Sequence, residues 1–289
     1  AAAGEPPRDA ARDPRKVAIV GYFLDRNEDD HLGNVAEIRR LLAALDLDLV
    51  TVWLEGTPTA DLARVAEAGT ILSLPHGRAA AEVLAGRTGA RLVPCEVPFG
   101  IDATARFLRT AAAACGGGRE EAAESLIRAE LARCMPRLRW LVPKRLAHGR
   151  WAFAGDPALI PGLCEIASLV GARVDLAVAW THRPPETLWD PAPPPATEVV
   201  VLHDQNAGAL RETLEARADR IDLLIGNHHV VLEHLLPNSL GFLEFGFPSL
   251  IHHGIGDDPF LGYRGFLRFL SRIADQFYDW DLEFEEVDV

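Results

Sequence analysis

Cysteine is scarce in this chain of 289 residues, and the spacing of its four cysteines excludes two kinds of site. Cys95, Cys115, Cys134 and Cys164 are too far apart to form the Cys-x-x-Cys pair that a zinc ribbon or a dithiol redox motif needs. We therefore expect a reduced, cytosolic protein. Cys115 and Cys164 lie in apolar helical patterns and are expected in the core, whereas Cys95 stands where a strand passes into a loop.

Lysine is almost absent as well, because it occurs only at Lys16 and Lys144 in a chain whose formal net charge is -13. A protein that binds nucleic acid needs clustered lysine and arginine to neutralise phosphates. The arginines of this chain lie mostly among acids on expected helices, with one basic patch at residues 137–145. The composition therefore argues against nucleic acid as a partner.

Long apolar runs and nucleotide-binding loops are also missing. Charges or glycines break the apolar stretches well short of the roughly 20 residues that a membrane span needs, and no signal peptide is visible. No expected strand is followed by Gly-x-Gly-x-x-Gly, and no Gly-Lys-Ser or Gly-Lys-Thr occurs. With 48% hydrophobic residues the chain can still bury a sizeable core. We expect a soluble globular protein with no nucleotide of its own and no membrane partner.

The beginning of the chain is unusual. Residues 1–15 are rich in alanine, proline and charge, which is typical of a linker, and the only methionine is Met135. These features predict that the chain is a fragment from which an upstream part is missing.

From Lys16 onward, short β-branched runs alternate with amphipathic helical stretches, and this rhythm predicts an α/β fold with a mainly parallel, doubly wound sheet. We place a first Rossmann-like domain at residues 16–140. Its expected strands are 17–20, 49–54, 70–74 and 91–94, and its expected helices are 34–45, 59–68, 78–88 and 102–114. A helical connector over residues 120–134, closed by Pro136, follows them.

A second Rossmann-like domain is expected at residues 141–289, ending in a long helix. The expected strands are 150–154, 173–179, 198–202 and 221–225, and the expected helices are 158–170, 206–216 and 262–277. The proline-rich stretch 184–195 is expected to be a surface loop. Ligands of open parallel sheets bind beyond the carboxyl ends of the strands, so two tandem domains predict a ligand cleft between them.

The histidines are concentrated where such a cleft would lie. Eight of the ten fall in loops expected to follow strands: His31, His76, His182, His203, His228, His229, His252 and His253. The segment 245–264 adds Asp257 and Asp258 to the last pair. A plainer interpretation is that loops favour polar residues, and that the two aspartates cap the final helix. The sequence alone leaves both interpretations open.

Several segments of the chain, in this order, resemble the nitrogenase component 1 superfamily. They are VAIVGYFLD at 17–25, NVAEIRRLL at 34–42, VPFGIDATARFL at 97–108, FAGDP at 153–157, DLLIGN at 222–227, GFPS at 246–249 and FLGYRG at 260–265. The superfamily includes both nitrogenase molybdenum-iron protein subunits, their cofactor-assembly scaffold relatives and the dark-operative protochlorophyllide reductase subunits. The resemblance implies three Rossmann-like domains around a cleft, of which the amino-terminal domain, with its cluster cysteines, is missing here.

The resemblance also suggests site residues. His252, seven residues before Pro259, resembles the histidine that binds the catalytic cofactor, and His76 falls at or next to the position of the cysteine at the cofactor's other end. A thiolate suits iron-sulfur clusters, whereas imidazole suits iron, zinc or a tetrapyrrole metal. A molybdenum-iron cofactor is therefore in doubt, and an iron-sulfur-type metallocluster or a tetrapyrrole is expected. Cys95 could supply a thiolate from the neighbouring strand end.

The leading functional hypothesis is an oxidoreductase subunit that receives electrons from an ATP-dependent iron-sulfur partner and reduces a cofactor or substrate in the interdomain cleft. His76 and His252 would be metal ligands or proton donors, and the further catalytic candidates are His228, His229 and His253. Gly77, Gly226 and Asn227 are expected to join His76 and Cys95 in binding the cofactor. A homologous subunit is expected as a second partner. Two alternatives are a metallocluster assembly scaffold and a small-molecule or metal-chelate binding module.

Overall fold

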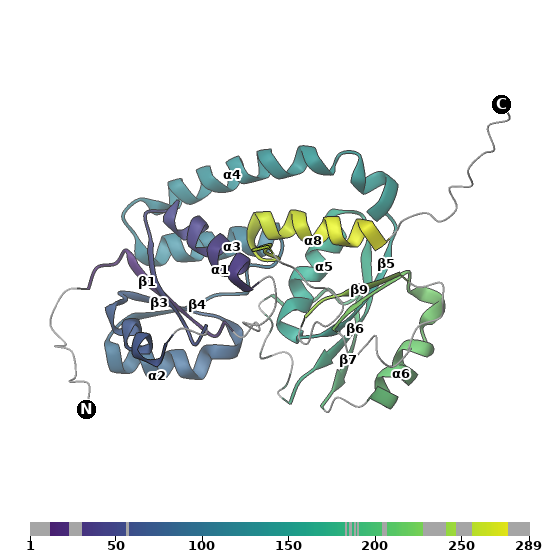
Figure 1. Ribbon diagram of the computed structural model, residues 1–289, viewed down its shortest axis with the longest axis horizontal. Coiled ribbons are helices and arrows are strands. Elements are labelled where there is room, and N and C mark those ends of the chain that lie inside the picture. The colour runs from purple at the N-terminus through teal and green to yellow at the C-terminus, as the bar shows by residue number, and fades with distance from the viewer. Residues whose placement is uncertain are drawn as a thin grey trace.

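The computed structural model describes residues 12–22, 31–55, 58–182, 191–203, 207–227, 241–246 and 256–276, together with residues 184, 187 and 189. Two α/β units lie side by side, each built on its own parallel sheet (Figure 1). The predicted fold class, two tandem Rossmann-like units, is confirmed. No helix of the described ranges is long and apolar enough to cross a membrane.

The first unit has a four-stranded sheet in the order β2-β1-β3-β4, with every neighbouring pair parallel. Its strands are β1 Lys16–Val20, β2 Asp48–Trp53, β3 Thr70–Ser73 and β4 Arg91–Pro94. Its helical elements are α1 His31–Ala43, the 3-10 segments η1 Thr59–Glu67 and η2 Pro75–Gly77, α2 Arg78–Thr88 and α3 Ile101–Cys115. The apolar residues of β1 are buried, as expected for a parallel strand with helices on both faces.

The second unit has a five-stranded sheet in the order β7-β6-β5-β8-β9, again with all neighbours parallel. Its strands are β5 Arg150–Gly155, β6 Arg173–Trp180, β7 Glu198–Leu202, β8 Leu223–Gly226 and β9 Gly241–Glu244. Its helical elements are η4 Pro157–Leu159, α5 Ile160–Leu169, α6 Ala207–Glu215 and η6 Ala218–Arg220. β5 is therefore the central strand, and its carboxyl end lies in the middle of that edge.

One long helix connects the units along the chain. α4 (Arg119–Leu138) leads from the first unit to η3 (Val142–Leu146), one turn of π-helix before β5. The expected helix end at Pro136 is wrong, because α4 continues through it to Leu138. The proline leaves the carbonyl of Ala132 without its helical donor, and since Ala132 is exposed, water can replace that donor.

The last described helix, α8 (Gly262–Gln276), packs against α1, α3, α4 and β9 (Figure 1). It therefore serves both units, although the sequence assigned it to the second. The side chain of Asn34 in α1 helps to hold it, because its Oδ1 accepts from the backbone N–H groups of Phe260 and Leu261 at 2.8 and 2.9 Å. These bonds satisfy amides at the approach to the helix that have no intrahelical partner.

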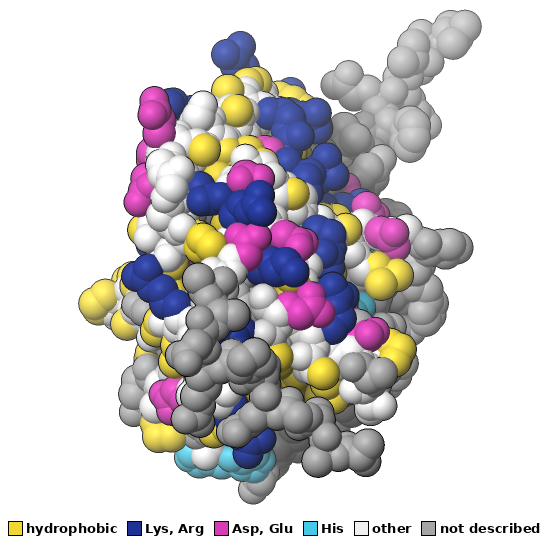
Figure 2. Space-filling model, turned by 90° about the vertical axis from the view of Figure 1, so that its left-hand side faces the viewer, with side chains coloured by type: hydrophobic (Ala, Val, Ile, Leu, Met, Phe, Trp, Pro, Cys, Tyr) yellow, Lys and Arg dark blue, Asp and Glu magenta, His cyan; other side chains and the backbone are white. Residues whose placement is uncertain are grey.

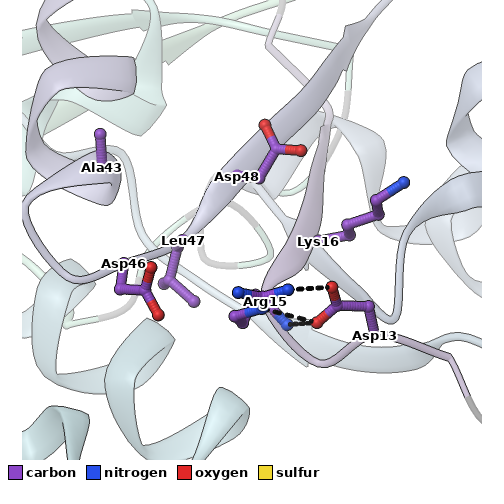
Figure 3. Close-up of a pocket in the computed structure, with 7 residues that line it drawn as sticks. All are labelled: Asp13, Arg15, Lys16, Ala43, Asp46, Leu47 and Asp48. Carbon is purple, nitrogen blue, oxygen red and sulfur yellow. Dashed lines mark hydrogen bonds and ion pairs between the residues drawn. The ribbon is translucent and has the colours of Figure 1, made fainter.

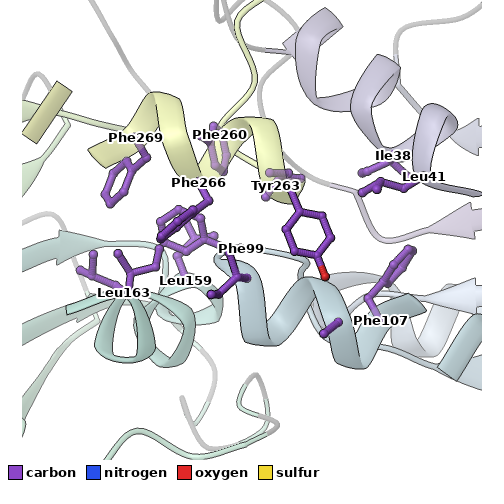
Figure 4. Packing of buried hydrophobic residues seen from close by; sticks show 14 of the residues in the cluster. Ile38, Leu41, Phe99, Phe107, Leu159, Leu163, Phe260, Tyr263, Phe266 and Phe269 are labelled. Carbon is purple, nitrogen blue, oxygen red and sulfur yellow. The ribbon is translucent and has the colours of Figure 1, made fainter. Parts of the chain in front are cut away.

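The largest hydrophobic cluster runs through both units beneath α8 (Figure 4). Phe99, which precedes α3, stacks on Phe245 at 5.7 Å between ring centroids and contacts Phe260 and Phe269 edge-on. Aromatic pairs in these orientations stabilise a core beyond the burial of their area. Because the rings come from both units, this cluster fixes how the carboxyl edges of the two sheets meet.

Candidate functional site

The carboxyl edge of the first sheet is built around a contact between two glycines. Gly21 follows β1 with a φ of +97°, and a Cβ placed on it would lie 2.4 Å from the backbone nitrogen of Gly77. The N–H of Leu74 donates to the carbonyl oxygen of Val20 at 2.8 Å, and the N–H of Gly77 donates to the carbonyl oxygen of Leu74 at 3.0 Å. Only glycine allows backbones this close. The contact places η2, which includes His76, over the ends of β1 and β3.

His76 pairs with Asp156, 80 residues further along the chain. Its Nε2 lies 3.0 and 2.9 Å from the two carboxylate oxygens of Asp156, which directly follows β5. A carboxylate only accepts hydrogen bonds, so Nε2 carries the proton and donates. This pair joins the carboxyl ends of β3 and β5, the edges where ligands of parallel sheets bind. Both side chains are about one-third exposed or less, at 26% and 32%.

Asp156 is held by its own local structure. Its Oδ1 also accepts from the backbone N–H of Ala158 at 2.9 Å, so Asp156 caps η4, with Pro157 in the first turn. The indole of Trp189 donates to the carbonyl oxygen of Pro157 at 3.0 Å and covers this turn. The backbone of this turn therefore orients the carboxylate of Asp156 independently of the imidazole of His76.

Cys95 follows β4 at the same edge, as expected, but its side chain points into the core. It is 4% exposed, and burial raises the pKa of its thiol to about 12. The side chain of Arg78 donates to its carbonyl oxygen at 2.8 Å and to that of Ser73, and so ties the ends of β3 and β4 together. Cys95 is therefore a neutral thiol near pH 7 in this arrangement, without the thiolate character of a metal ligand.

A second polar contact crosses between the units close by. The guanidinium of Arg106 in α3 donates to Glu96 at 2.7 Å and to Glu165 of α5 at 2.8 Å. These hydrogen bonds raise the pKa of Arg106. Gly162 of α5 lies so near Phe99 that a Cβ would meet the Phe99 carbonyl oxygen at 2.4 Å. The junction is thus closely packed on one side and polar at His76 on the other.

Gly226 and Asn227 occupy the edge of the second sheet next to Asp156. β8 pairs with β5 in the register Ala154↔Gly226, so Asn227 directly follows that pair at the carboxyl edge. Asn227 is buried, and the carbonyl of Gly226 accepts from Phe245 at 2.7 Å. These two predicted residues therefore lie one strand away from Asp156, at the same edge of the sheet.

Two further polar side chains, His31 and Glu55, lie near the carboxyl ends of β1 and β2. His31, expected in a loop, is instead the first residue of α1; its buried ring lies 5.5 Å from that of Tyr22, and its Nδ1 has no hydrogen-bond partner among the described residues. Glu55 follows β2, and burial raises the pKa of its carboxyl group, while the neighbouring His31 and Arg39 act to lower it. A carboxyl group with a raised pKa keeps its proton to higher pH, which suits proton transfer.

The four histidines predicted to be catalytic, His228, His229, His252 and His253, lie outside the described residues. Within the part of the chain that the structure describes, no three histidine, cysteine, aspartate or glutamate side chains are placed to hold a metal ion. His76 is thus the one proposed metal ligand whose surroundings are described. Its partner Asp156 was missed as a site residue, although Asp-Pro directly after a strand already indicated a fixed carboxylate.

A cavity of about 440 Å³ lies at the opposite, amino edge of the first sheet (Figure 3). It is lined by Asp13, Arg15, Lys16, Ala43, Asp46, Leu47 and Asp48. Arg15 pairs with Asp13 at 2.9 Å within this group. Ligands of parallel sheets bind at the carboxyl edge, so this cavity is not the candidate site.

Comparison with known proteins gives the family. The family model described as Nitrogenase component 1 type Oxidoreductase matches residues 3–278, which is most of the chain. No curated protein sequence matches it.

Solved structures share the fold. The structure described as nitrogenase Cp1 at pH 6.5 is 21% identical with a TM-score of 0.69, over 92% of this chain and 60% of that one. Nitrogenase Cp1 at pH 5 gives 13% identity and a TM-score of 0.66 over 93% and 58%. A periplasmic metal binding protein from Candidatus Liberibacter asiaticus gives 12% identity and a TM-score of 0.54, over 91% of this chain and 100% of that one. The chain thus spans about three fifths of the nitrogenase chains that it resembles.

Proposed function

Because the chain belongs to the nitrogenase component 1 type oxidoreductase family, we propose that it forms the cofactor-facing part of a reductase subunit. In this proposal an ATP-dependent iron-sulfur partner delivers electrons, and a substrate or cofactor is reduced where the carboxyl edges of the two sheets meet. The chain spans 60% of its nitrogenase relative, so the partner, a homologous subunit and the whole reaction are parts of the proposal.

The observation that carries this proposal is the pair of His76 and Asp156. It combines an imidazole and a carboxylate from the two units at the edge where parallel sheets bind ligands. A carboxylate that accepts from one ring nitrogen orients the imidazole and increases the basicity of the other nitrogen. This arrangement is typical of histidines that bind metals or move protons.

The described residues bear on which cofactor fits. All four cysteines are buried, and burial raises their pKa values, so a cluster held by thiolates of these residues does not fit. The donor that fits is the imidazole of His76, which suits a metal site or a tetrapyrrole metal completed by residues outside the described ranges. His252 remains the proposed second ligand.

In this proposal the side chains have distinct tasks. A bound metal cofactor supplies the electron chemistry. Asp156 holds the N–H of His76 Nε2, so that the basic lone pair is on Nδ1. Through Nδ1, His76 would hold the metal, or would take up a proton there and pass that proton on to the substrate. Burial raises the pKa of Glu55, so this carboxyl group after β2 keeps its proton to a higher pH than an exposed one, and the packed aromatic rings beneath α8 exclude water from that side.

The proposal is tested on the longest native reading frame, purified without oxygen. Iron, sulfide and the visible spectrum are measured, and the absorbance is followed after adding an ATP-dependent iron-sulfur reductase with and without ATP. We expect a chromophore that is reduced only when both the reductase and ATP are present. The variants His76→Ala and His252→Ala are expected to weaken it. His203→Ala is the matched control, because His203 follows the edge strand β7 and its Nδ1 contacts only the carbonyl of Thr181 among described residues.

Either of two other outcomes would contradict the proposal and favour a different function. A chromophore that is bound but never reduced, and that passes to a second protein, would indicate an assembly scaffold. A colourless protein that binds metal chelates would indicate a binding module. The likeness to the full length of a periplasmic metal binding protein favours the binding module over the scaffold, since two such units form the whole fold of that protein.

A further inference from the structure

The carboxyl end of α4 carries an exposed basic and aromatic surface far from the candidate site. Its residues are Met135, Arg137, Arg139, Trp140 and Lys144, which we call the α4-end patch. Trp140 is 62% exposed and Met135 41%, and the three cations around them are exposed too. Arg137 lies in the last turn of α4, Arg139 and Trp140 follow in the turn after it, and Lys144 lies in η3, so these exposed side chains are close together along the chain.

The cations of this patch differ from most others in the protein. The side chains of Arg137, Arg139 and Lys144 make no ion pair or hydrogen bond with any residue of the described ranges. Many arginines elsewhere form ion pairs with acidic side chains, as Arg109 of α3 does with Glu124 in the first half of α4. On the face of the first unit shown in Figure 2, basic and acidic side chains lie next to one another. Unpaired like charges around an exposed tryptophan favour an acidic occupant that also has apolar side chains.

The sequence itself contains such a segment. Residues 279–289 include six acidic residues and no lysine or arginine, with apolar residues alternating between the acids. The acids are Asp279, Asp281, Glu283, Glu285, Glu286 and Asp288, and the apolar residues are Trp280, Leu282, Phe284, Val287 and Val289. In an extended chain, alternation over residues 279–285 places four acids on one side and Trp280, Leu282 and Phe284 on the other; after Glu285 the pattern shifts by one residue.

The last described helix ends close enough for this segment to reach the patch. α8 ends at Gln276, three residues before Asp279, and α8 contacts η3, which includes Lys144. Ala274 of α8 and Val142 of η3 pack against the same apolar cluster. An extended chain covers about 3.3 Å per residue, so a segment of this length can span the whole patch.

We propose that residues 279–289 bind to the α4-end patch of the same chain. The acids pair with Arg137, Arg139 and Lys144, and the apolar side chains cover Trp140 and Met135. The bound segment ties α8, which contacts both units, to the end of the helix that connects them. This inference does not depend on the proposed reductase activity.

Disulfide trapping in the full chain tests the proposal. Ala132 is exposed one helical turn before Met135, and the variant pair Ala132→Cys with Val287→Cys places one thiol at the patch and one in the segment. The control pair is Gly86→Cys with Val287→Cys, since Gly86 lies in α2 with open space around it. The four native cysteines are buried and do not compete. We expect the disulfide within one chain to form at least about tenfold faster for the Ala132 pair, because binding raises the local thiol concentration.

Charge reversal gives the second measurement. Adding Arg137→Glu and Arg139→Glu to the Ala132 pair is expected to remove the rate advantage, whereas Arg87→Glu with Arg220→Glu, a matched reversal of exposed arginines elsewhere, is expected to preserve it. Equal rates for the Ala132 and Gly86 pairs would overturn the proposal. Disulfides formed only between two chains would also overturn it, as would an advantage that survives charge reversal at the patch.

Discussion

The carboxyl edge of the first sheet is tied to the second unit by a polar side-chain pair, whereas the described polar contacts around the cavity at its amino edge stay within the first unit. At the carboxyl edge Gly21 touches Gly77, and His76 reaches Asp156 of the second unit. At the amino edge Asp13 pairs with Arg15, two residues away, beside a cavity of about 440 Å³. The described cavity thus lies at the edge where the polar contacts are local in sequence.

This difference shows that a cavity by itself does not identify the functional site of this molecule. The amino-edge cavity is lined by residues from two short stretches of the first unit, and its Asp13 and Arg15 pair with each other. The carboxyl edge instead brings together side chains that are far apart in sequence. Long-range convergence of an imidazole and a carboxylate is the stronger indication of a site.

Breaking the glycine contact should have the largest effect. Gly21→Ala forces a Cβ to within 2.4 Å of the Gly77 backbone nitrogen at a φ of +97°. The free energy of unfolding is expected to fall by about 3 kcal/mol, from overpacking and backbone strain together. Urea denaturation measures it. The matched control Gly86→Ala in α2, where a Cβ meets nothing within 4 Å, should instead stabilise by about 0.5–1 kcal/mol. Equal effects of the two changes would refute the close contact.

Removing the cross-unit carboxylate should have the next largest effect. Asp156→Ala deletes both the cap of η4 and the partner of His76, so we expect a loss of about 1.5 kcal/mol in the free energy of unfolding. Asp48→Ala at the amino-edge cavity is the control, with an expected change within about 0.5 kcal/mol. A double-mutant cycle with His76→Ala should show non-additivity. Additive losses would show that the pair contributes nothing as a pair.

Alkaline pH should reveal the buried thiol of Cys95. Its folded pKa of about 12 lies above the ordinary value of 9, so its contribution to stability is complete below pH 9 and is lost as the pH rises toward 12. At pH 10 the loss is about 1.4 kcal/mol for this group alone. Denaturation of wild type and Cys95→Ala between pH 8 and 10 measures it. A wild type whose stability falls no faster than that of Cys95→Ala would indicate an ionised, ligand-like thiolate.

Acid should have the smallest effect, and it concerns the amino edge. Hydrogen bonds from Arg15 lower the pKa of Asp13 to about 2, so its contribution is present above pH 4 and is lost as the pH falls toward 2. Asp13→Asn should therefore remove a small part of the acid sensitivity. The comparison is made by thermal unfolding between pH 5 and 2.5. A large change would mean that the amino edge matters more for folding than its exposure suggests.

Local signals in the sequence predicted most of this fold. β-branched runs such as residues 17–20 and 70–74 became β1 and β3, because a parallel strand buried on both faces has a simple apolar pattern. The position of His76 after a strand was predicted for the same reason. The end of α4 was wrong because Pro136 lies where the lost hydrogen bond faces solvent, which composition does not reveal.

Contacts between the units could not be predicted. His76 and Asp156 are 80 residues apart, and their meeting depends on how α8 and the aromatic rings around Phe99 dock one sheet against the other. The same holds for α8, whose apolar face was assigned to the second unit alone, although it also packs on α1 and α3. The burial of Cys95 also depends on this packing. Periodicity shows which face of an element is apolar, but not which partner covers it.

The most direct test of the account is the cofactor content of two matched histidine variants. His76 and His203 both follow parallel strands, but only His76 lies at the junction of the units. In the full-length protein purified without oxygen, we predict that His76→Ala loses most of the bound metal and of the visible absorbance, whereas His203→Ala and the amino-edge variant Asp48→Ala retain both. Unchanged metal content in His76→Ala, or its loss in Asp48→Ala, would contradict the assignment of the site to the carboxyl edge.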